Sequence, residues 1–118
     1  MIESTTTTNE VWRPVLGYED IYAASNLGRV RREKPAINTF PGRILKAKLT
    51  RGRPTVQLQK DGQGKQWYVH TLVIQAFVGP RPCGLECNHK NGIKTDNRPE
   101  NLEYMTRSEN CLHRSRVL

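Results

Sequence analysis

Residues that can bind a metal ion or transfer a proton gather in the last third of the sequence. Asn88 and His89 are adjacent, Asn101 follows at the end of a polar stretch, and Asn110 and His113 lie three positions apart near the C-terminus. Amide oxygens bind hard divalent cations, and an imidazole can take a proton from water near neutral pH. The combination indicates one-metal chemistry at a phosphate, with a histidine as general base.

The elements around these residues should bring them together. A strand over 85–89 is followed by a polar loop over 90–101 and a second strand over 102–105. Residues 106–109 have the spacing of a capping box, which predicts a final helix. A hairpin with this helix folded across it would bring the end of the first strand to the helical turn that carries Asn110.

A helix precedes this hairpin. Its apolar residues follow the spacing of one buried helical face, and Gly79 with Pro80 ends the pattern; these residues are Val69, Leu72, Val73, Ala76 and Phe77. His70 opens the helix, and we interpret it as a packing or capping residue rather than a reacting one.

The first half of the chain is typical of strands and turns. Residues 11–40 contain short apolar pieces separated by turn residues, including Ser-Asn-Leu-Gly over 25–28. Residues 54–60 alternate between apolar and polar, which predicts a strand with Thr55 on its polar face. A turn over 61–64 should then lead into a second strand, so this part forms a hairpin.

Basic residues are concentrated in one segment. The chain has 118 residues and a net charge of +8, and residues 29–53 alone hold nine basic residues against one acidic residue. Such a local field suits a polyanion, and DNA is the partner that we expect. A membrane surface is disfavoured because no amphipathic apolar face accompanies the charges. The expected DNA-binding residues are Arg29, Arg31, Arg32, Arg43, Lys46, Lys48, Arg51 and Arg53.

Five of these basic residues fall within 43–53, with no acidic residue between them. If this stretch forms a strand, Lys46 and Lys48 share one face, and Arg51 and Arg53 lie together. We expect it to carry the larger part of the DNA affinity, at a distance from His89.

Composition also predicts the compartment. No apolar run approaches the roughly 20 residues that a transmembrane helix needs, and the first ten residues lack the layout of a secretion signal. Three cysteines, an odd number, fit a reducing environment. We expect an intracellular, cytoplasmic protein.

Two long segments resemble known sequence families. Residues 69–113, VHTLVIQAFVGPRPCGLECNHKNGIKTDNRPENLEYMTRSENCLH, resemble the HNH nuclease domain of bacteriophage and mobile-intron endonucleases, whose fold is the ββα-metal hairpin and helix. Residues 11–32, VWRPVLGYEDIYAASNLGRVRR, resemble the small β-rich NUMOD module that often precedes that domain in homing endonucleases. Together they imply a DNA-cleaving enzyme that acts in a bacterial host, with a phage or host protein as a further candidate partner.

The resemblance also implies roles for individual residues. It makes His89 the general base and Asn88 the metal ligand that precedes it. Asn101 matches the middle asparagine of the motif, which holds the loop and so aims the histidine, and Asn110 becomes the second ligand. Both ligands are neutral amides, so Asp96 or Glu109 would be the first candidates for an additional carboxylate. Candidates for contact with phosphate or metal are Arg98, His113 and Arg114.

The implied cofactor is one divalent ion, Mg²⁺ in the first place and Mn²⁺ as an alternative. Structural Zn²⁺ is the competing choice, with soft ligands available at Cys83, Cys87, His89, Cys111 and His113. Zinc is disfavoured because paired Cys-x2-Cys knuckles are absent and because binding through His89 would remove the base.

We therefore predict an α+β protein in three parts. Residues 1–9 form a frayed tail, residues 10–66 a basic β-rich NUMOD-like module that contacts DNA, and residues 67–118 the HNH unit with the ββα-metal fold. The predicted function is metal-dependent hydrolysis of DNA phosphodiester bonds. The alternative is a DNA-binding accessory factor that keeps the HNH fold and does not cut.

Overall fold

The computed structural model describes residues 10–35 and 39–107. The elements within these ranges are mostly strands, joined by one α-helix and one 3₁₀ turn, which confirms the expected α+β class. In chain order they are β1 (Trp12–Pro14), β2 (Tyr22–Ser25), β3 (Val30–Arg32), β4 (Lys48–Thr50), β5 (Arg53–Lys60), β6 (Gln63–Tyr68), α1 (Val69–Phe77), β7 (Leu85–His89), the 3₁₀ turn η2 (Pro99–Asn101) and β8 (Leu102–Thr106).

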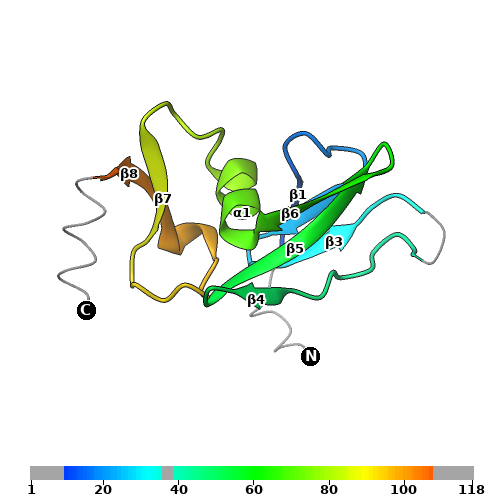
Figure 1. Ribbon diagram of the computed structural model, residues 1–118, viewed down its shortest axis with the longest axis horizontal. Helices are drawn as coiled ribbons and strands as arrows, with labels where there is room; N and C mark the ends of the chain where they lie inside the picture. The colour runs from blue at the N-terminus through cyan, green and yellow to red at the C-terminus, as the bar shows by residue number, and fades with distance from the viewer. Residues whose placement is uncertain (1–9, 36–38, 108–118) are drawn as a thin grey trace.

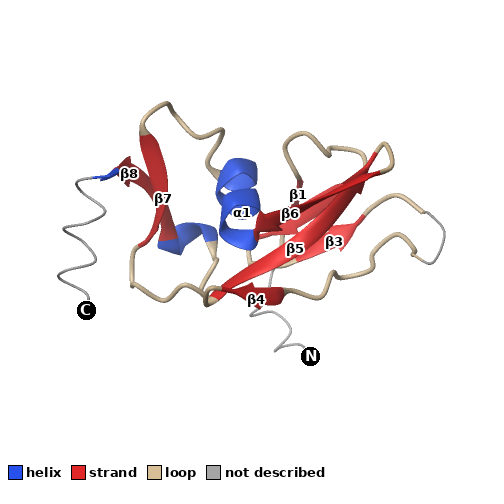
Figure 2. Ribbon diagram, in the orientation of Figure 1, coloured by secondary structure: helices blue, strands red, loops and turns tan. Residues whose placement is uncertain are grey.

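The strands form three antiparallel sheets around the helix. Strands β1, β2 and β3 make one sheet, β4, β5 and β6 make a second, and β7 pairs with β8 in a two-stranded sheet. Figure 1 shows the two three-stranded sheets on one side of α1 and the β7–β8 hairpin on the other. The same view coloured by secondary structure emphasises that strands surround this single described α-helix (Figure 2).

A turn joins β2 to β3, as the sequence predicts, and hydrogen bonds between side chains and the backbone hold it. The buried Ser25 hydroxyl accepts hydrogen bonds from the backbone N–H groups of Leu27 and Arg29, both at 3.1 Å. The Asn26 side chain accepts a third from the backbone of Val11 at 2.8 Å. Gly28 closes the turn with a φ of 82°, a conformation that glycine adopts without steric cost.

The basic stretch differs from the continuous strand that its alternation suggested. Residues 43–45 run beside β3, where Leu45 N–H donates to the Val30 carbonyl at 2.8 Å, and the chain then leaves this sheet to form β4. Arg51 and Gly52, with φ values of 55° and 79°, make the tight turn between β4 and β5. Arg51 therefore lies in a turn, and the expected pairing of Arg51 with Arg53 on a strand is wrong.

The β5–β6 hairpin also has a tighter turn than expected. Asp61 and Gly62 connect the strands with positive φ values, and Gln63 already belongs to β6. Thr55 is buried rather than exposed, because its hydroxyl donates to the Lys48 carbonyl at 2.9 Å and accepts from the Gln66 amide at 2.8 Å. The hydrogen bonds to neighbouring strands make burial of this polar side chain tolerable.

One hydrophobic core links both halves of the chain. On α1 the fully buried residues are Val69, Leu72, Val73 and Ile74, so the buried face includes Ile74 in place of the half-buried Ala76 and Phe77. They pack in one cluster with residues from the sheets and from β8, which are Val15, Tyr22, Ala24, Val30, Val56, Leu58 and Leu102. The expected β-rich part and the expected nuclease part therefore share a core.

The predicted strand, loop and strand after α1 are present. Strands β7 and β8 pair over their full length, from Leu85 opposite Thr106 to His89 opposite Leu102. The final helix predicted from Thr106 lies almost wholly outside the described residues. Among those described, no helix has the length and apolar character that crossing a membrane requires.

Candidate active site

His89 lies at the end of β7 with its side chain turned toward α1. Its residue is 8% exposed, Nε2 lies 2.7 Å from Oδ1 of Asn97, and its ring meets that of His70 edge to face with centroids 5.1 Å apart. Burial lowers the pKa of His89, and the hydrogen bond with Asn97 opposes that shift in part. The imidazole is therefore held neutral, the form that can accept a proton.

Asn97 was not predicted as a site residue. It is 4% exposed although it belongs to the polar loop, and its amide oxygen is a direct partner of His89. Six asparagines occur from position 26 to position 101, and several occupy turns. No pattern in one sequence separates Asn97 from the others, because its burial depends on distant parts of the chain.

Asn88 leaves β7 on the opposite face from His89, as adjacent strand residues do. It is 4% exposed, and its amide nitrogen donates to Oε2 of Glu103 at 3.2 Å, directly across the hairpin on β8. Glu103 thus supplies a carboxylate beside the predicted ligand, a role for which Asp96 and Glu109 were the expected candidates.

Asn101 ties the loop together rather than touching the histidine in the contacts that the structure shows. Its amide nitrogen donates to Oδ1 of Asn91 at 3.0 Å and to the Asp96 carbonyl at 2.9 Å, and its own Oδ1 accepts from the Asn91 backbone at 3.1 Å. Its carbonyl accepts from the Lys90 backbone at 2.7 Å. These bonds close the loop that carries Asn97, which fits the holding role that the resemblance implies.

Arg98 is engaged within the same loop. Its guanidinium makes two 2.8 Å contacts with the Asp96 carboxylate and one of 3.3 Å with Glu100. The Arg98 side chain holds the pKa of Asp96 well below its usual range. Asp96 is therefore committed to Arg98 and Asn91, which makes it a poor candidate for an additional metal ligand.

A cavity of about 620 Å³ opens beside His89. His70 and His89 line it, together with three arginines from three parts of the chain, Arg53, Arg81 and Arg107. Arg53 lies close enough to lower the pKa of both histidines through its charge. The expectation that all of the basic stretch lies far from His89 is wrong at Arg53, because the tight turn at 51–52 starts β5 next to the cavity.

His70 packs in this cavity and does not cap its helix. Its ring stacks on Tyr68 with centroids 5.2 Å apart, and Nδ1 is buried without a hydrogen-bond partner in the described part of the chain. Burial, with smaller contributions from His89 and Arg53, lowers the pKa of His70 to about 4. His70 is therefore neutral at physiological pH.

The arginines of β3, and Arg29 just before it, lie against aromatic rings and acidic groups. Arg31 stacks over Trp12 at 4.2 Å from the ring centroid, Arg29 lies over the same ring at 5.7 Å and pairs with Glu10, and Arg32 covers Tyr22 at 5.2 Å. These contacts are the cation–π type, in which the positive charge lies on the face of the ring.

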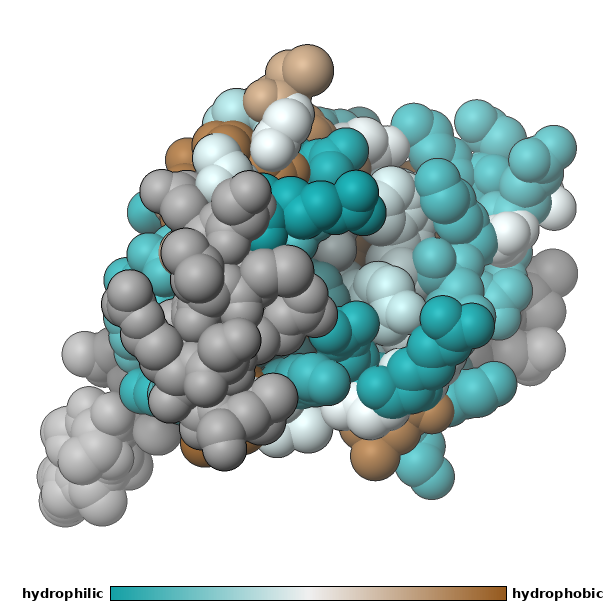
Figure 3. All heavy atoms as spheres, turned by 60° about the vertical axis from the view of Figure 1, so that its left-hand side comes forward, coloured by the Kyte–Doolittle hydropathy of each residue, from teal (hydrophilic) through white to brown (hydrophobic). Residues whose placement is uncertain are grey.

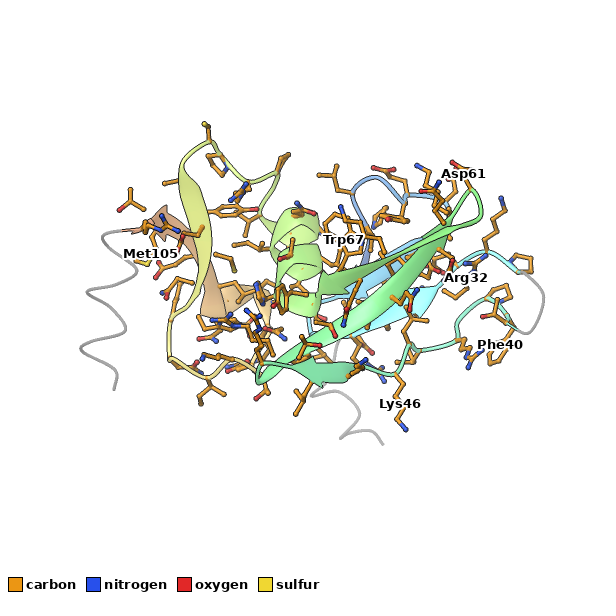
Figure 4. The ribbon with its side chains drawn as sticks, in the orientation of Figure 1. Arg32, Phe40, Lys46, Asp61, Trp67 and Met105 are labelled. Atoms are coloured by element: carbon orange, nitrogen blue, oxygen red, sulfur yellow. The ribbon has the colours of Figure 1, made fainter. Side chains whose placement is uncertain are left out.

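The remaining predicted basic residues are exposed, namely Arg43, Lys46, Lys48 and Arg51. Lys46 and Lys48 line one groove beside β5, so they do share a face, although only Lys48 belongs to β4. Figure 4 shows Lys46 pointing away from the molecule, whereas Trp67 of β6 lies beside α1. On the coloured part of the face in Figure 3 hydrophilic residues predominate, and apolar patches lie at its upper and lower edges.

Some predicted site residues lie outside the described residues. They are Asn110, His113 and Arg114, and Glu109 and Cys111 lie there too. Among residues 10–35 and 39–107, no three His, Cys, Asp or Glu side chains are grouped as a metal site would require. Cys83 is exposed, and burial raises the pKa of Cys87 to about 12, so its thiol stays protonated.

Two family models match separate parts of the chain. Residues 67–112 match the model described as HNH endonuclease, and residues 10–59 match the NUMOD4 motif. The chain joins a NUMOD4 motif to an HNH endonuclease domain. In this structure the HNH domain carries His89, Asn97 and Asn101, whereas the NUMOD4 motif carries the first sheet and most of β5 with Arg53.

Curated relatives share both parts. An uncharacterized HNH endonuclease of Acanthamoeba polyphaga mimivirus, L247, is 39% identical over 110 residues, which are 89% of this chain and 26% of L247. DNA endonuclease I-HmuI of Bacillus phage SP01 is 35% identical over 100 residues, which are 84% of this chain and 54% of I-HmuI. The chain thus spans about half the length of I-HmuI and about a quarter of L247.

A solved structure gives the same relationship in three dimensions. It is described as DNA binding and cleavage by the HNH homing endonuclease I-HmuI, and it matches with a TM-score of 0.78 and 32% identity over 92% of this chain and 60% of the other. The likeness extends across the NUMOD4 motif and the HNH domain together, which confirms both resemblances seen in the sequence.

Proposed function

We propose that this chain is a metal-dependent endonuclease that hydrolyses phosphodiester bonds in double-stranded DNA, with His89 as the general base. The main support is the setting of His89, which is held by Asn97 and kept neutral beside a cavity lined by arginines. A neutral imidazole can take a proton from an attacking water, and arginines attract a phosphate. The HNH domain and the likeness to I-HmuI support the same reaction.

Asn88 and Asn110 are the residues that would hold the divalent ion, with Mg²⁺ as the first choice and Mn²⁺ as the alternative. The amide of Asn88 fits this role because its nitrogen donates to Glu103, which leaves its oxygen, a suitable ligand for a hard cation, directed elsewhere. When bound, the ion would stabilise negative charge on the phosphate and the leaving oxygen. Asn101 would keep the loop closed so that Asn97 stays in place.

Two surfaces would bind the DNA backbone. The cavity with Arg53 and Arg81 would receive the phosphate at the reaction site, and the exposed residues Lys46, Lys48 and Arg51 would contact phosphates beyond it. Arg53 thus belongs with the cavity rather than with the outer surface.

The experiment that tests the proposal is cleavage of supercoiled plasmid. We expect relaxation with Mg²⁺ or Mn²⁺, loss of cleavage with a chelator, and a rate about 10²- to 10⁴-fold lower for His89→Ala, the usual contribution of a general base. DNA affinity of His89→Ala should stay within a few-fold of the wild-type value. The control is Gln63→Ala, an exposed position at the start of β6 in the β5–β6 hairpin, and this variant should cleave normally.

A different result would overturn the assignment. DNA binding without cleavage at any divalent ion would favour the accessory-factor alternative. Cleavage by His89→Ala at the wild-type rate would show that another group is the base.

A further inference from the structure

The bond between His89 and Asn97 determines which imidazole nitrogen carries the proton. An amide oxygen can only accept a hydrogen bond, so Nε2 of His89 must donate to Oδ1 of Asn97 across the 2.7 Å separation. In the neutral ring the lone pair then belongs to Nδ1. Asn97 therefore selects both the tautomer and the orientation of the ring.

Asn97 is itself held by the first sheet. Gly28, in the turn between β2 and β3, lies so close that a Cβ on it would be 3.3 Å from the Cβ of Asn97 and 3.5 Å from its backbone carbonyl carbon and oxygen. A Cβ at position 28 would therefore force the turn or Asn97 to shift by a few tenths of an ångström. The two residues are 69 positions apart in the sequence and belong to different family motifs.

The turn that carries Gly28 is rigid for local reasons. The Ser25 hydroxyl bonds to two backbone N–H groups, and Gly28 N–H donates to the Ser25 carbonyl at 3.1 Å. Asn26 joins the turn to the backbone on both sides of Val11, since the Asn26 N–H donates to the Val11 carbonyl at 3.1 Å. The Ser-Asn-Leu-Gly turn is thus fixed by its own hydrogen bonds where it contacts Asn97.

We infer that the NUMOD4 turn at Ser25–Gly28 is a positioning element of the nuclease site, which acts by seating Asn97 so that Asn97 fixes the tautomer and direction of His89. Asn97 is a positioning residue and the turn supports it. The N-terminal motif then serves the chemistry of the HNH domain as well as DNA contact. This inference rests on the proposed role of His89 as the base.

The first test replaces Asn97. Asn97→Leu keeps the approximate volume and removes the acceptor, so kcat should fall by roughly 100-fold, the cost of a small misplacement of a reacting group, while DNA affinity changes by less than about threefold. Asn97→Asp keeps an acceptor oxygen and should recover much of that loss. A purely structural role would lower thermal stability in both variants and would not separate kcat from affinity in this way.

A spectroscopic measurement on the free protein gives a second readout. The ¹⁵N shifts of the imidazole nitrogens identify the tautomer, and the chain has only three histidines to assign. We expect the Nε2–H tautomer for His89 in the wild type and a mixture in Asn97→Leu. The same tautomer in both proteins would overturn the inference.

The turn is tested with matched glycine variants. Gly28 and Gly17 have nearly the same positive φ, 82° and 85°, but a Cβ on Gly17 would meet nothing within 4 Å. Both alanine variants place a Cβ on a residue with positive φ, and only Gly28→Ala should also disturb Asn97. We expect kcat of Gly28→Ala to be roughly tenfold below that of Gly17→Ala at equal DNA affinity.

The outcomes distinguish this inference from the proposed function. If Gly28→Ala and Asn97→Leu cleave like the wild type while His89→Ala is inactive, the positioning role is wrong and the base assignment stands. If His89→Ala cleaves normally, the proposed function itself fails.

Discussion

His70 and His89 come from α1 and β7, and their rings meet at the wall of the cavity next to Arg53. Two imidazolium ions and a guanidinium at such short range would repel one another. Burial lowers the pKa of both histidines, with a smaller contribution from Arg53 to each and from His89 to that of His70, so the pair stays neutral where a free histidine would begin to ionise. This arrangement leaves the positive charge of the cavity to the arginines.

The low pKa of His70 predicts a pH dependence of stability. The pKa is about 4 in the folded protein and about 6.5 in the unfolded chain, so below pH 6.5 the unfolded chain binds a proton that the folded protein does not. The free energy of unfolding should therefore decrease as the pH falls from about 6.5 to 4. His70→Phe, which keeps an aromatic ring against Tyr68, should weaken this dependence in urea titrations from pH 4 to 7.5.

His89 contributes in the same direction, so the comparison of His70→Phe with the wild type isolates the part due to His70. Equal pH dependence in the two proteins would contradict the prediction.

The contact between Asn88 and Glu103 predicts a change in metal requirement. Removing the Glu103 carboxylate leaves the Asn88 amide without its partner, and groups that orient a metal ligand contribute about 10- to 100-fold to metal affinity. Glu103→Ala should therefore need about 10-fold or more Mg²⁺ for half-maximal cleavage. Asp96→Asn is the comparison, since Asp96 is bonded to Arg98, and it should change the Mg²⁺ requirement less. A larger effect of Asp96→Asn would reverse the assignment.

At the residue scale, sequence reasoning found the side chains whose chemistry shows in their type and spacing. Asn88, His89 and Asn101 fall at motif positions, and the structure puts them around one hairpin and its loop. Asn97 and Glu103 were missed as participants because what distinguishes them is burial and contact with other elements. A single sequence does not contain that information for a polar residue in a loop or on a strand.

At the element scale, the hairpin of β4 and β5 depends on a turn that the charge pattern concealed. Positive φ values at Arg51 and Gly52 match the mirror-image turns that suit the twist of two-residue hairpins, and these turns favour Asn-Gly. The basic residues in this stretch predicted DNA contact on a strand, whereas Gly52 favours the positive φ of the turn between β4 and β5. Alternation placed Val56 and Leu58 correctly because the strand that follows is regular.

This turn predicts that two neighbouring substitutions differ in their effect on stability. Gly52→Ala should lower the free energy of unfolding by about 1 to 2 kcal/mol, the cost of a left-handed conformation for a residue with a Cβ, because nothing within 4 Å of that Cβ adds or relieves strain. Arg51→Asn should not lower it, since asparagine tolerates this conformation. Urea denaturation of both variants measures the difference, and a loss in Arg51→Asn as large as in Gly52→Ala would contradict the assignment of the turn.

At the scale of the whole molecule, the exposed basic residues Lys46, Lys48 and Arg51 predict how DNA binding depends on salt. Each cation that neutralises a phosphate contributes about 0.9 to the slope of log K against log salt. Replacing Lys46, Lys48 and Arg51 by glutamine should therefore reduce the slope by about 2 to 3. The control variant replaces Lys60 and Lys65 on the β5–β6 hairpin by glutamine and should change the slope by less than about 1. Fluorescence anisotropy with a labelled duplex at several salt concentrations gives both slopes.

The shared core predicts that both family motifs unfold together. Leu72 is 1% exposed and packs with core residues of the sheets, and Leu→Ala changes at such sites cost about 2 to 5 kcal/mol. Leu72→Ala should lower the midpoint of one cooperative transition followed by both near-UV and far-UV signals. Two separate transitions, with only the later one shifted, would mean that the motifs fold independently.

The order of the two motifs along the chain could be predicted from the sequence, but the hydrophobic core that they share could not. The resemblances divide the chain near residue 66, whereas Val15, Val30 and Leu72 meet in one cluster. Contacts between positions so far apart leave no local pattern, because each residue simply looks apolar. The same reason hid the approach of Gly28 to Asn97.

The aromatic contacts of the two tryptophans have a practical consequence. Trp12 lies under Arg31 and Arg29 on the first sheet, whereas Trp67 lines the cavity and donates its indole N–H to Tyr18. The chain has no other tryptophan. A phosphate that draws an arginine off Trp12 would alter only that indole's emission, while one that enters the cavity would alter that of Trp67. Single-tryptophan variants would then act as built-in optical reporters and show, without any attached dye, which surface DNA reaches first.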